Sequence, residues 1–316
     1  MQTYILRRLT FSLPALLLTS LIVFGLMHII PGDVITAKLA DQGTVRKADV
    51  DLMKHQYGLD KPLYEQYVIW VGRIARGDLG HSILTSESIN QSLSRALPVT
   101  VELALLSLGV GIVLGVSLGI VSAVARNSPG DYVSRVVAIV GLSAPDFWLG
   151  TLLVTFFAIW FGWSPPLRFY PLLTHPLSNL AQFILPALIV GYRFSCTIMR
   201  ITRSSLLEVL REDYIRTASA KGMRQQSVIF RHALKNAFLP VITIIGGQLA
   251  VLLGGLAIIE QIFALPGLGR LALQGLTFRD YPLVQADVMV FATLVICVNL
   301  MVDVSYGWLD PRIRFR

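Results

Sequence analysis

Three charged residues stand in or beside long apolar stretches of this sequence: Asp146, Arg193 and Glu260. A charge at the centre of a lipid bilayer costs about 2.5 to 3.5 kcal/mol on the insertion scale, so each of them needs a compensating environment. Asp146 is expected either to line a solute pathway or to form a hydrogen bond between helices. Arg193 is expected either to face the same pathway or to extend its head group to the cytoplasmic surface near Arg200.

The sequence contains little that indicates an enzyme. None of the six lysines follows a glycine, so the phosphate-binding pattern G-x-x-x-x-G-K-[ST] is missing. No Ser/His/Asp set or carboxylate pair stands out, and the histidines are scattered singly without metal-ligand spacing. We therefore expect a chain that is not an enzyme and that binds neither a metal nor a cofactor.

A second group of candidates lies in the polar, basic segment 213–240. Its first part, 213–221, is a good helix former with Asp213 in the first turn, where a negative charge suits the helix dipole. Gly222 then offers a left-handed stop, and 226–237 predicts a second helix with one apolar face. Pro240 is expected to mark the start of the next apolar helix. Such a rigid elbow suits docking to another protein.

The elements that position these residues are expected to cross a membrane. Only 15% of the residues are charged, the hydrophobic share is 54% and the mean hydropathy is +0.65. A bilayer core about 30 Å thick requires roughly 20 apolar residues of helix. The sequence predicts an all-α integral membrane protein with six spans, at residues 1–30 and at about 101–125, 136–161, 180–200, 238–259 and 284–305.

Charge on the connecting segments predicts the orientation. Residues 193–235 hold nine Lys or Arg against three acids, whereas residues 31–97 hold eight of each sign. We expect both termini and the polar loop 201–237 to be cytoplasmic, and 31–97 to form an outer domain of short helices broken at Gly58 and Gly77. A membrane core is predicted over 98–306, with a tail at 307–316. The net charge of +8 follows from this topology, and nucleic acid is not expected as a partner.

Small residues indicate how two of these helices pack. Gly111, Gly115 and Gly119 form a G-x-x-x-G-x-x-x-G series along one helix face. Such a stripe lets the backbone of a neighbouring helix approach closely. It predicts a helix bundle.

Several motifs together resemble one family, the permease subunits of bacterial ABC importers. The segment 213–240 is similar to their coupling segment, with Arg216-Thr217-Ala218 in place of Glu-Ala-Ala and Ser219 in place of a basic residue. "YILRRL", "HIIPGD", "YGLDKP", "GDLGHSI", "EQIFALPGLGR" and "RDYPLVQ" also resemble its hallmarks, in order along nearly the whole chain. The similarity is greatest to the branch that imports dipeptides and oligopeptides and, in some members, glutathione or nickel.

The resemblance implies a type I importer fold and a set of functional residues. Glu260, in the Glu-x-x-Phe-x-x-Pro-Gly-x-Gly run, is expected to shape an outer gate. The residues expected to couple the chain to ATPases are Tyr214, Arg216, Thr217, Ala218, Ala220, Lys221, Gly222, His232 and Asn236.

The resemblance also implies partners in the inner membrane. They would be a second, homologous permease forming a heterodimer, two ATPase subunits that bind ATP and Mg²⁺, and a substrate-binding protein that delivers the cargo. Two other functions remain open from the residues alone. They are an ion-coupled secondary transporter, which would need inverted repeats and more buried carboxylates, and a non-transporting membrane scaffold.

Overall fold

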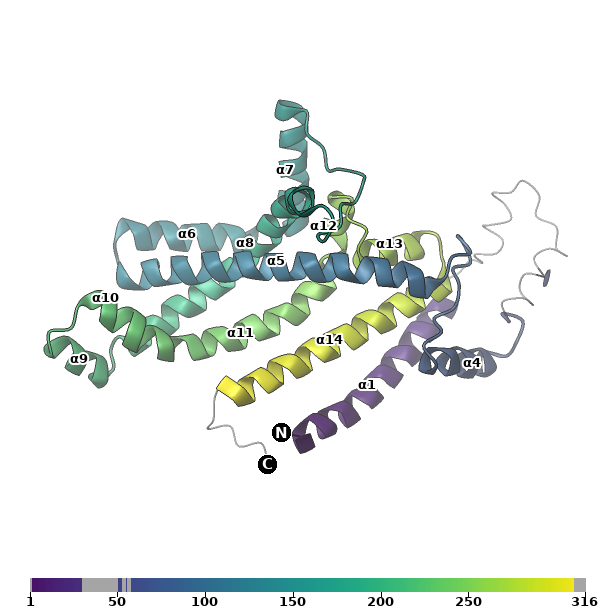
Figure 1. Cartoon of the computed structure of the whole chain (residues 1–316), viewed down its shortest axis with the longest axis horizontal. Helices are drawn as coiled ribbons and strands as arrows, with labels where there is room; N and C mark the ends of the chain where they lie inside the picture. Colours follow the sequence, from purple (N-terminus) through teal and green to yellow (C-terminus); the bar gives the residue numbers. More distant parts are fainter. Residues whose placement is uncertain (1, 30–50, 53–54, 56–57, 310–316) are drawn as a thin grey trace. The chain divides into compact units, whose positions relative to one another are not determined.

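The computed structural model describes residues 2–29, 51–52, 55 and 58–309, and this part of the chain is built from helices (Figure 1). It divides into two compact units, one drawn mainly from residues 1–100 and 266–300 and the other mainly from 101–265. In chain order the helices are α1 (Gln2–Ile29), α4 (Leu63–Ala75), α5 (Ile89–Val124), α6 (Pro129–Ser143), α7 (Asp146–Phe161), α8 (Pro176–Val209), α9 (Asp213–Ala220), α10 (Gln225–Ser227), the π-helix η1 (Val228–Ala233), α11 (Leu234–Gly255), α12 (Ala257–Ile262), α13 (Leu268–Thr277) and α14 (Tyr281–Leu309).

Within the described residues, five helical stretches are long and apolar enough to cross a membrane, or six if α6 and α7 count as one. The sequence predicted one span over 136–161, and the structure bends this stretch into two helices, so that it counts as one span only if the broken pair is taken together. The two helices meet at an angle of 97°, and Figure 1 shows α7 turning away from α6. Ala144 is extended, with φ −87° and ψ 124°, because the ring of Pro145 disfavours a helical conformation in the residue before it.

Three helices extend beyond the predicted spans. Helix α5 begins at Ile89 rather than near 101, and α8 continues to Val209 rather than ending near 200. No break separates the second helix of the polar segment from the next apolar helix, since Pro240 lies inside α11. Hydropathy locates the apolar part of a helix, but a helix continues past it wherever the backbone hydrogen bonds continue.

The glycine stripe packs closely against a neighbouring helix, as the sequence predicted, and that neighbour is α8. A Cβ atom built on Gly115 would lie 2.7 Å from Cβ of Ile198, and one on Gly119 would lie 2.6 Å from Cβ of Thr202. A Cβ atom built on Gly191 of α8 would likewise lie 2.6 Å from Cβ of Val110. Helix α8 also packs against α6, α7 and α11, so it lies at the centre of this unit.

In the other unit, α1 packs against α4 of the predicted outer segment. The hydroxyl groups of Ser20 and Tyr67 are 2.8 Å apart, and the ring of Phe24 packs against those of Tyr67 and Trp70. Gly58 and Gly77 have φ of +68° and +78°, which confirms the two predicted breaks.

A short loop in the same unit is held by a single buried carboxylate. Asp280 accepts hydrogen bonds from the Ser82 hydroxyl and from the backbone N–H groups of Ile83 and Leu84. Ser82 belongs to the "GDLGHSI" motif and Asp280 to "RDYPLVQ", nearly 200 residues later. The contact gives these two distant motifs a shared structural role.

Candidate functional site

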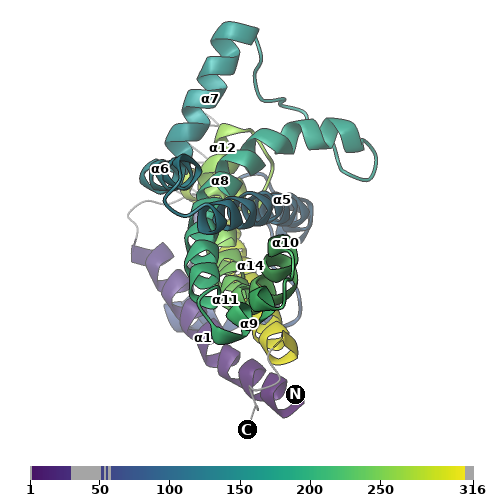
Figure 2. The ribbon, with the colours of Figure 1, turned by 90° about the vertical axis from the view of Figure 1, so that its left-hand side faces the viewer.

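The polar segment folds into two helices that lie side by side, and we call residues 213–237 the elbow. Figures 1 and 2 show α9 beside α10, and α9 also contacts η1. Helix α9 begins after Glu212, whose extended backbone (φ −67°, ψ 146°) lets its carbonyl accept from the N–H groups of Ile215 and Arg216. The predicted order of helix, glycine turn and helix is confirmed.

The turn depends on the backbone of Gly222. Its φ is +75°, a backbone conformation that residues other than glycine and asparagine rarely adopt. The N–H of Gly222 donates to the Ser219 carbonyl at 3.0 Å, closing the end of α9. A Cβ atom added to Gly222 would meet nothing within 4 Å, so the requirement for glycine is conformational and does not arise from crowding.

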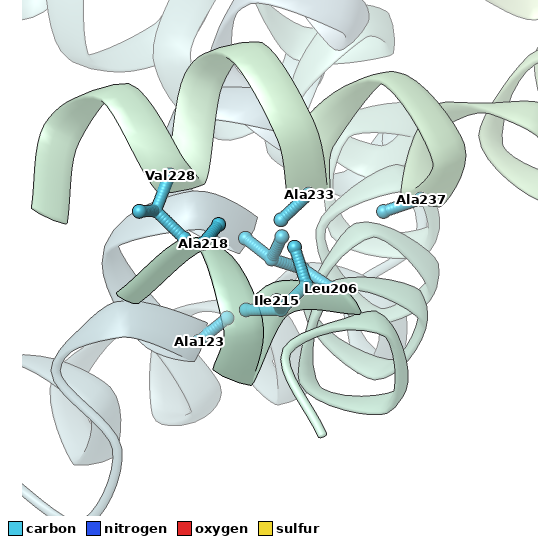
Figure 3. Packing of buried hydrophobic residues seen from close by; sticks show 7 residues of the cluster. All are labelled: Ala123, Leu206, Ile215, Ala218, Val228, Ala233 and Ala237. Carbon is cyan, nitrogen blue, oxygen red and sulfur yellow. The ribbon is translucent and has the colours of Figure 1, made fainter. Parts of the chain in front are cut away.

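An apolar core holds the elbow to the helices beneath it (Figure 3). Ile215 and Ala218 of α9 point toward Leu206 of α8 and Ala123 of α5. The second helix completes the core with three buried residues, Val228, Ala233 and Ala237. Burial of apolar side chains contributes roughly 25 cal/mol per Å² removed from water, so this core stabilises one orientation of α9 relative to α5 and α8.

The π-helix η1 explains how the second helix presents that face. Val228, Ala233 and Ala237 follow one another at intervals of five and four residues, and all three are buried. An interval of five does not fit one face of a regular α-helix, whereas one π-type turn, with hydrogen bonds from residue i to i+5, brings the side chains back into line.

The outward surface of the elbow is basic. Arg216, Lys221, Arg224, Arg231 and Lys235 are all exposed. Arg216 lies 3.2 Å from the Asp213 carboxylate, in a solvent-exposed pair that contributes little to stability. This surface therefore carries a net positive charge.

The residues predicted to couple the chain to ATPases divide into outward and inward groups. Ala218 is buried in the core of the elbow and His232 is half-buried. Asn236 donates from Nδ2 to the Tyr214 hydroxyl at 2.8 Å and so links the two helices. The exposed members are Tyr214, Arg216, Thr217, Ala220, Lys221, Gly222 and Asn236.

The structure brings Asp146 and Arg193 together. Nη1 of Arg193 donates to Oδ2 of Asp146 at 3.0 Å, which joins the first turn of α7 to the middle of α8. This contact is the interhelix bond that the sequence left open for Asp146, and the pair lines a cavity of about 240 Å³ together with Thr197 and Gln248. Glu260, the third candidate, is buried in α12 and is not among the residues that line this cavity.

Sequence reasoning missed a second ion pair, at the base of α5, α6 and α8. Arg203 of α8 donates from Nε and Nη2 to the two carboxylate oxygens of Asp131, both at 3.0 Å. The Ser122 hydroxyl, at the end of α5, donates to the same carboxylate at 2.5 Å. The signal was the sequence Ser128-Pro129-Gly130-Asp131, in which the Ser128 hydroxyl caps α6. The network anchors α5 and α8, the helices that carry the core of the elbow.

The chain is similar along its whole length to known transport proteins. Residues 115–315 match the family described as "Binding-protein-dependent transport system inner membrane component", and residues 1–104 match the corresponding N-terminal family. The glutathione transport system permease protein GsiC of Pectobacterium atrosepticum is 38% identical over all of both chains. The di/tripeptide transport system permease protein DppB of Pseudomonas aeruginosa is 37% identical over 99% of both chains.

Two solved structures share the fold at low sequence identity. One is an amino acid ABC transporter crystallised with histidines, with a TM-score of 0.51, 17% identity and coverage of 71% of this chain and 94% of that one. The other is the inward-facing MetNI methionine ABC transporter, with a TM-score of 0.55, 20% identity and coverage of 69% and 96%. The predicted all-α permease fold is confirmed.

Proposed function

This chain belongs to the family of inner membrane components of binding-protein-dependent transport systems, and on that premise we propose that it imports short peptides or a related small solute. It is a permease subunit of an ABC importer and not itself the ATPase. The observation that supports peptide cargo is the full-length similarity to permeases named for di- and tripeptides and for glutathione, itself a peptide.

The elbow is the element that we propose to receive force from the ATPases. Its core fixes α9 to α5 and α8, so a push on α9 is transmitted to helices that cross the membrane. Its exposed face offers Arg216, Thr217 and Lys221 to a partner surface, while Ala218 supports that face from inside. Closure of the ATPase pair on ATP would then shift the permease between two states.

The proposed assembly has four further components. A second, homologous permease completes the pathway as a heterodimer, two ATPase subunits bind ATP and Mg²⁺, and a binding protein delivers cargo. This chain binds no cofactor itself. The excess of basic residues over 193–235 favours an orientation with the elbow and both termini in the cytoplasm.

Co-purification followed by transport tests this proposal. The affinity-tagged chain, extracted from native membranes in mild detergent, is expected to retain ATPase subunits and one other permease. Cells that lack the chain should lose uptake of one labelled solute among alanyl-alanine, glutathione and nickel. Retention of no ATPase, with uptake of all three unchanged, would contradict the proposal.

A further inference from the structure

The cavity at Asp146 and Arg193 presents two opposite charges to one small space. The side chains are 21% and 51% exposed, respectively, although both residues lie in helices whose neighbouring positions are largely apolar. Full enclosure would remove both charges from water, at a cost that can exceed their mutual attraction. Here both groups stay partly accessible, so their charges can be offered to a solute.

The Asp146 carboxylate can accept a further hydrogen bond. Oδ1 of Asp146 is buried and has no hydrogen-bond partner among the described residues. A buried acceptor without a partner costs free energy, so this oxygen gains stability from any donor that enters the cavity. The bond from Nη1 of Arg193 engages one of the five N–H donors of a guanidinium.

We propose that Asp146 and Arg193 bind the two charged ends of a zwitterionic solute, the ammonium group at Asp146 and the carboxylate at Arg193. This inference rests on the proposed function and names the cargo class that the pathway admits. A solute with a single charge would pair with one partner and leave the other without its counter-charge. A zwitterion satisfies both and brings no net charge into the membrane.

The distance between Asp146 and Arg193 determines how a solute replaces their direct contact. The two groups are 3.0 Å apart and compensate each other while the cavity holds no cargo. The ends of a dipeptide are farther apart, since each added residue extends the chain by up to about 3.6 Å. Arg193 is the partner that moves, because it is long and half-exposed, whereas Asp146 is fixed in the first turn of α7 beside Pro145. Thr197 and Gln248 offer hydrogen bonds to the peptide group between the ends.

Removing both charges at once separates this role from a purely structural one. In cells carrying the complete transporter, Asp146→Asn and Arg193→Gln are each expected to lower uptake of radiolabelled alanyl-alanine about tenfold or more. The double variant Asp146→Leu with Arg193→Met replaces the ion pair by apolar side chains, a change that commonly preserves stability. Uptake should stay low in this variant while ATP hydrolysis stimulated by the binding protein persists. Recovery of uptake in the double variant would show that the pair only joins helices and would overturn the proposal.

The matched control is the other ion pair. Asp131→Asn makes the same chemical change in a buried network, and it should lower the amount of assembled complex in the membrane. Asp146→Asn should leave that amount unchanged. A loss of complex in Asp146→Asn equal to that in Asp131→Asn would contradict the proposal.

A labelling measurement keeps the proposal testable even if the double variant does not assemble. In the complete complex, Thr197→Cys is introduced after Cys196 and Cys297 have been replaced by alanine. Alanyl-alanine should slow the reaction of this cysteine with a maleimide about fivefold or more, as expected for a site mostly occupied by ligand. Alanyl-alanine blocked at both ends should not protect it, and equal protection by the blocked peptide would overturn the proposal.

The cargo of the unaltered transporter distinguishes the zwitterion site from the importer assignment. Import of nickel alone would overturn the zwitterion site and leave the importer assignment standing. If no solute of the panel is imported and no ATPase co-purifies, both the zwitterion site and the importer assignment are wrong.

Discussion

Replacing Gly222 by valine tests whether the elbow transmits force. The backbone there has φ +75°, and holding a non-glycine residue in such a conformation costs about 1 to 3 kcal/mol. An added Cβ would meet no atom within 4 Å, so the whole effect is backbone strain, and a β-branched residue should lie near the upper limit. At about 1.4 kcal/mol per factor of ten, the native turn loses roughly 5- to 150-fold in relative population.

The assay compares ATP hydrolysis with uptake in the purified complex. Gly222→Val should still insert and still bind the second permease, because the membrane-crossing helices are unchanged. It should either lose its ATPases or hydrolyse ATP with little uptake. Gly222→Asn is the matched control, since asparagine tolerates positive φ, and it should retain most of the coupling.

Crosslinking gives the independent readout. A cysteine at Thr217, which is exposed on α9, should crosslink to the ATPase surface, and the yield should fall in Gly222→Val. Ala218 is unsuitable because it is buried within the elbow. Normal uptake and undiminished crosslinking in Gly222→Val would show that the elbow is not the coupling element.

Three further changes test the packing and the hydrogen bonds within the two units. Gly115→Ala should lower the free energy of unfolding by about 1 to 3 kcal/mol, since its Cβ would lie 2.7 Å from that of Ile198. Gly109→Ala, whose Cβ would meet nothing within 4 Å, should cause no loss and should raise the stability of the helix slightly. Thermal unfolding of the two proteins in detergent distinguishes them. Asp280→Ala should cost about 1.5 to 3 kcal/mol, because three donors of the loop 82–84 lose a charged acceptor, and unaltered resistance of that loop to limited proteolysis would argue against this. Tyr214→Phe should cost less than about 1 kcal/mol, since its bond is exposed, and a loss of ATPase co-purification would reveal a direct docking role.

The helices and the glycine stripe were predictable because each depends on local pattern. A long apolar run signals a membrane helix wherever it packs, and Gly111, Gly115 and Gly119 form one face of any regular helix. The turn at Gly222 was predictable for the same reason. Glycine followed by a second amphipathic helix specifies a reversal without reference to the rest of the chain.

The behaviour of individual prolines was not predictable from pattern. Pro145 ends α6 and turns the chain by 97°, whereas Pro186 and Pro240 lie inside α8 and α11. Each of these rings removes one backbone hydrogen bond, and whether the helix continues depends on the neighbouring elements.

Pairings between distant residues were also hidden. The sequence treated Asp146 and Arg193 as separate charges, 47 residues apart, and did not single out Asp131 or Arg203. Ion pairs between helices depend on rotation and depth in the bundle, which one sequence does not specify. The helix cap at Ser128 was the one local signal that pointed to the Asp131–Arg203 pair.

ATP-driven uptake by a reconstituted complex tests the central claim most directly. Proteoliposomes containing this chain, its permease partner and the ATPases, supplied with the binding protein, should accumulate labelled alanyl-alanine or the solute found in the uptake panel when ATP is present. Omission of the chain, or of ATP, should abolish accumulation. Accumulation driven by an ion gradient in proteoliposomes that contain this chain without ATPases would contradict the account.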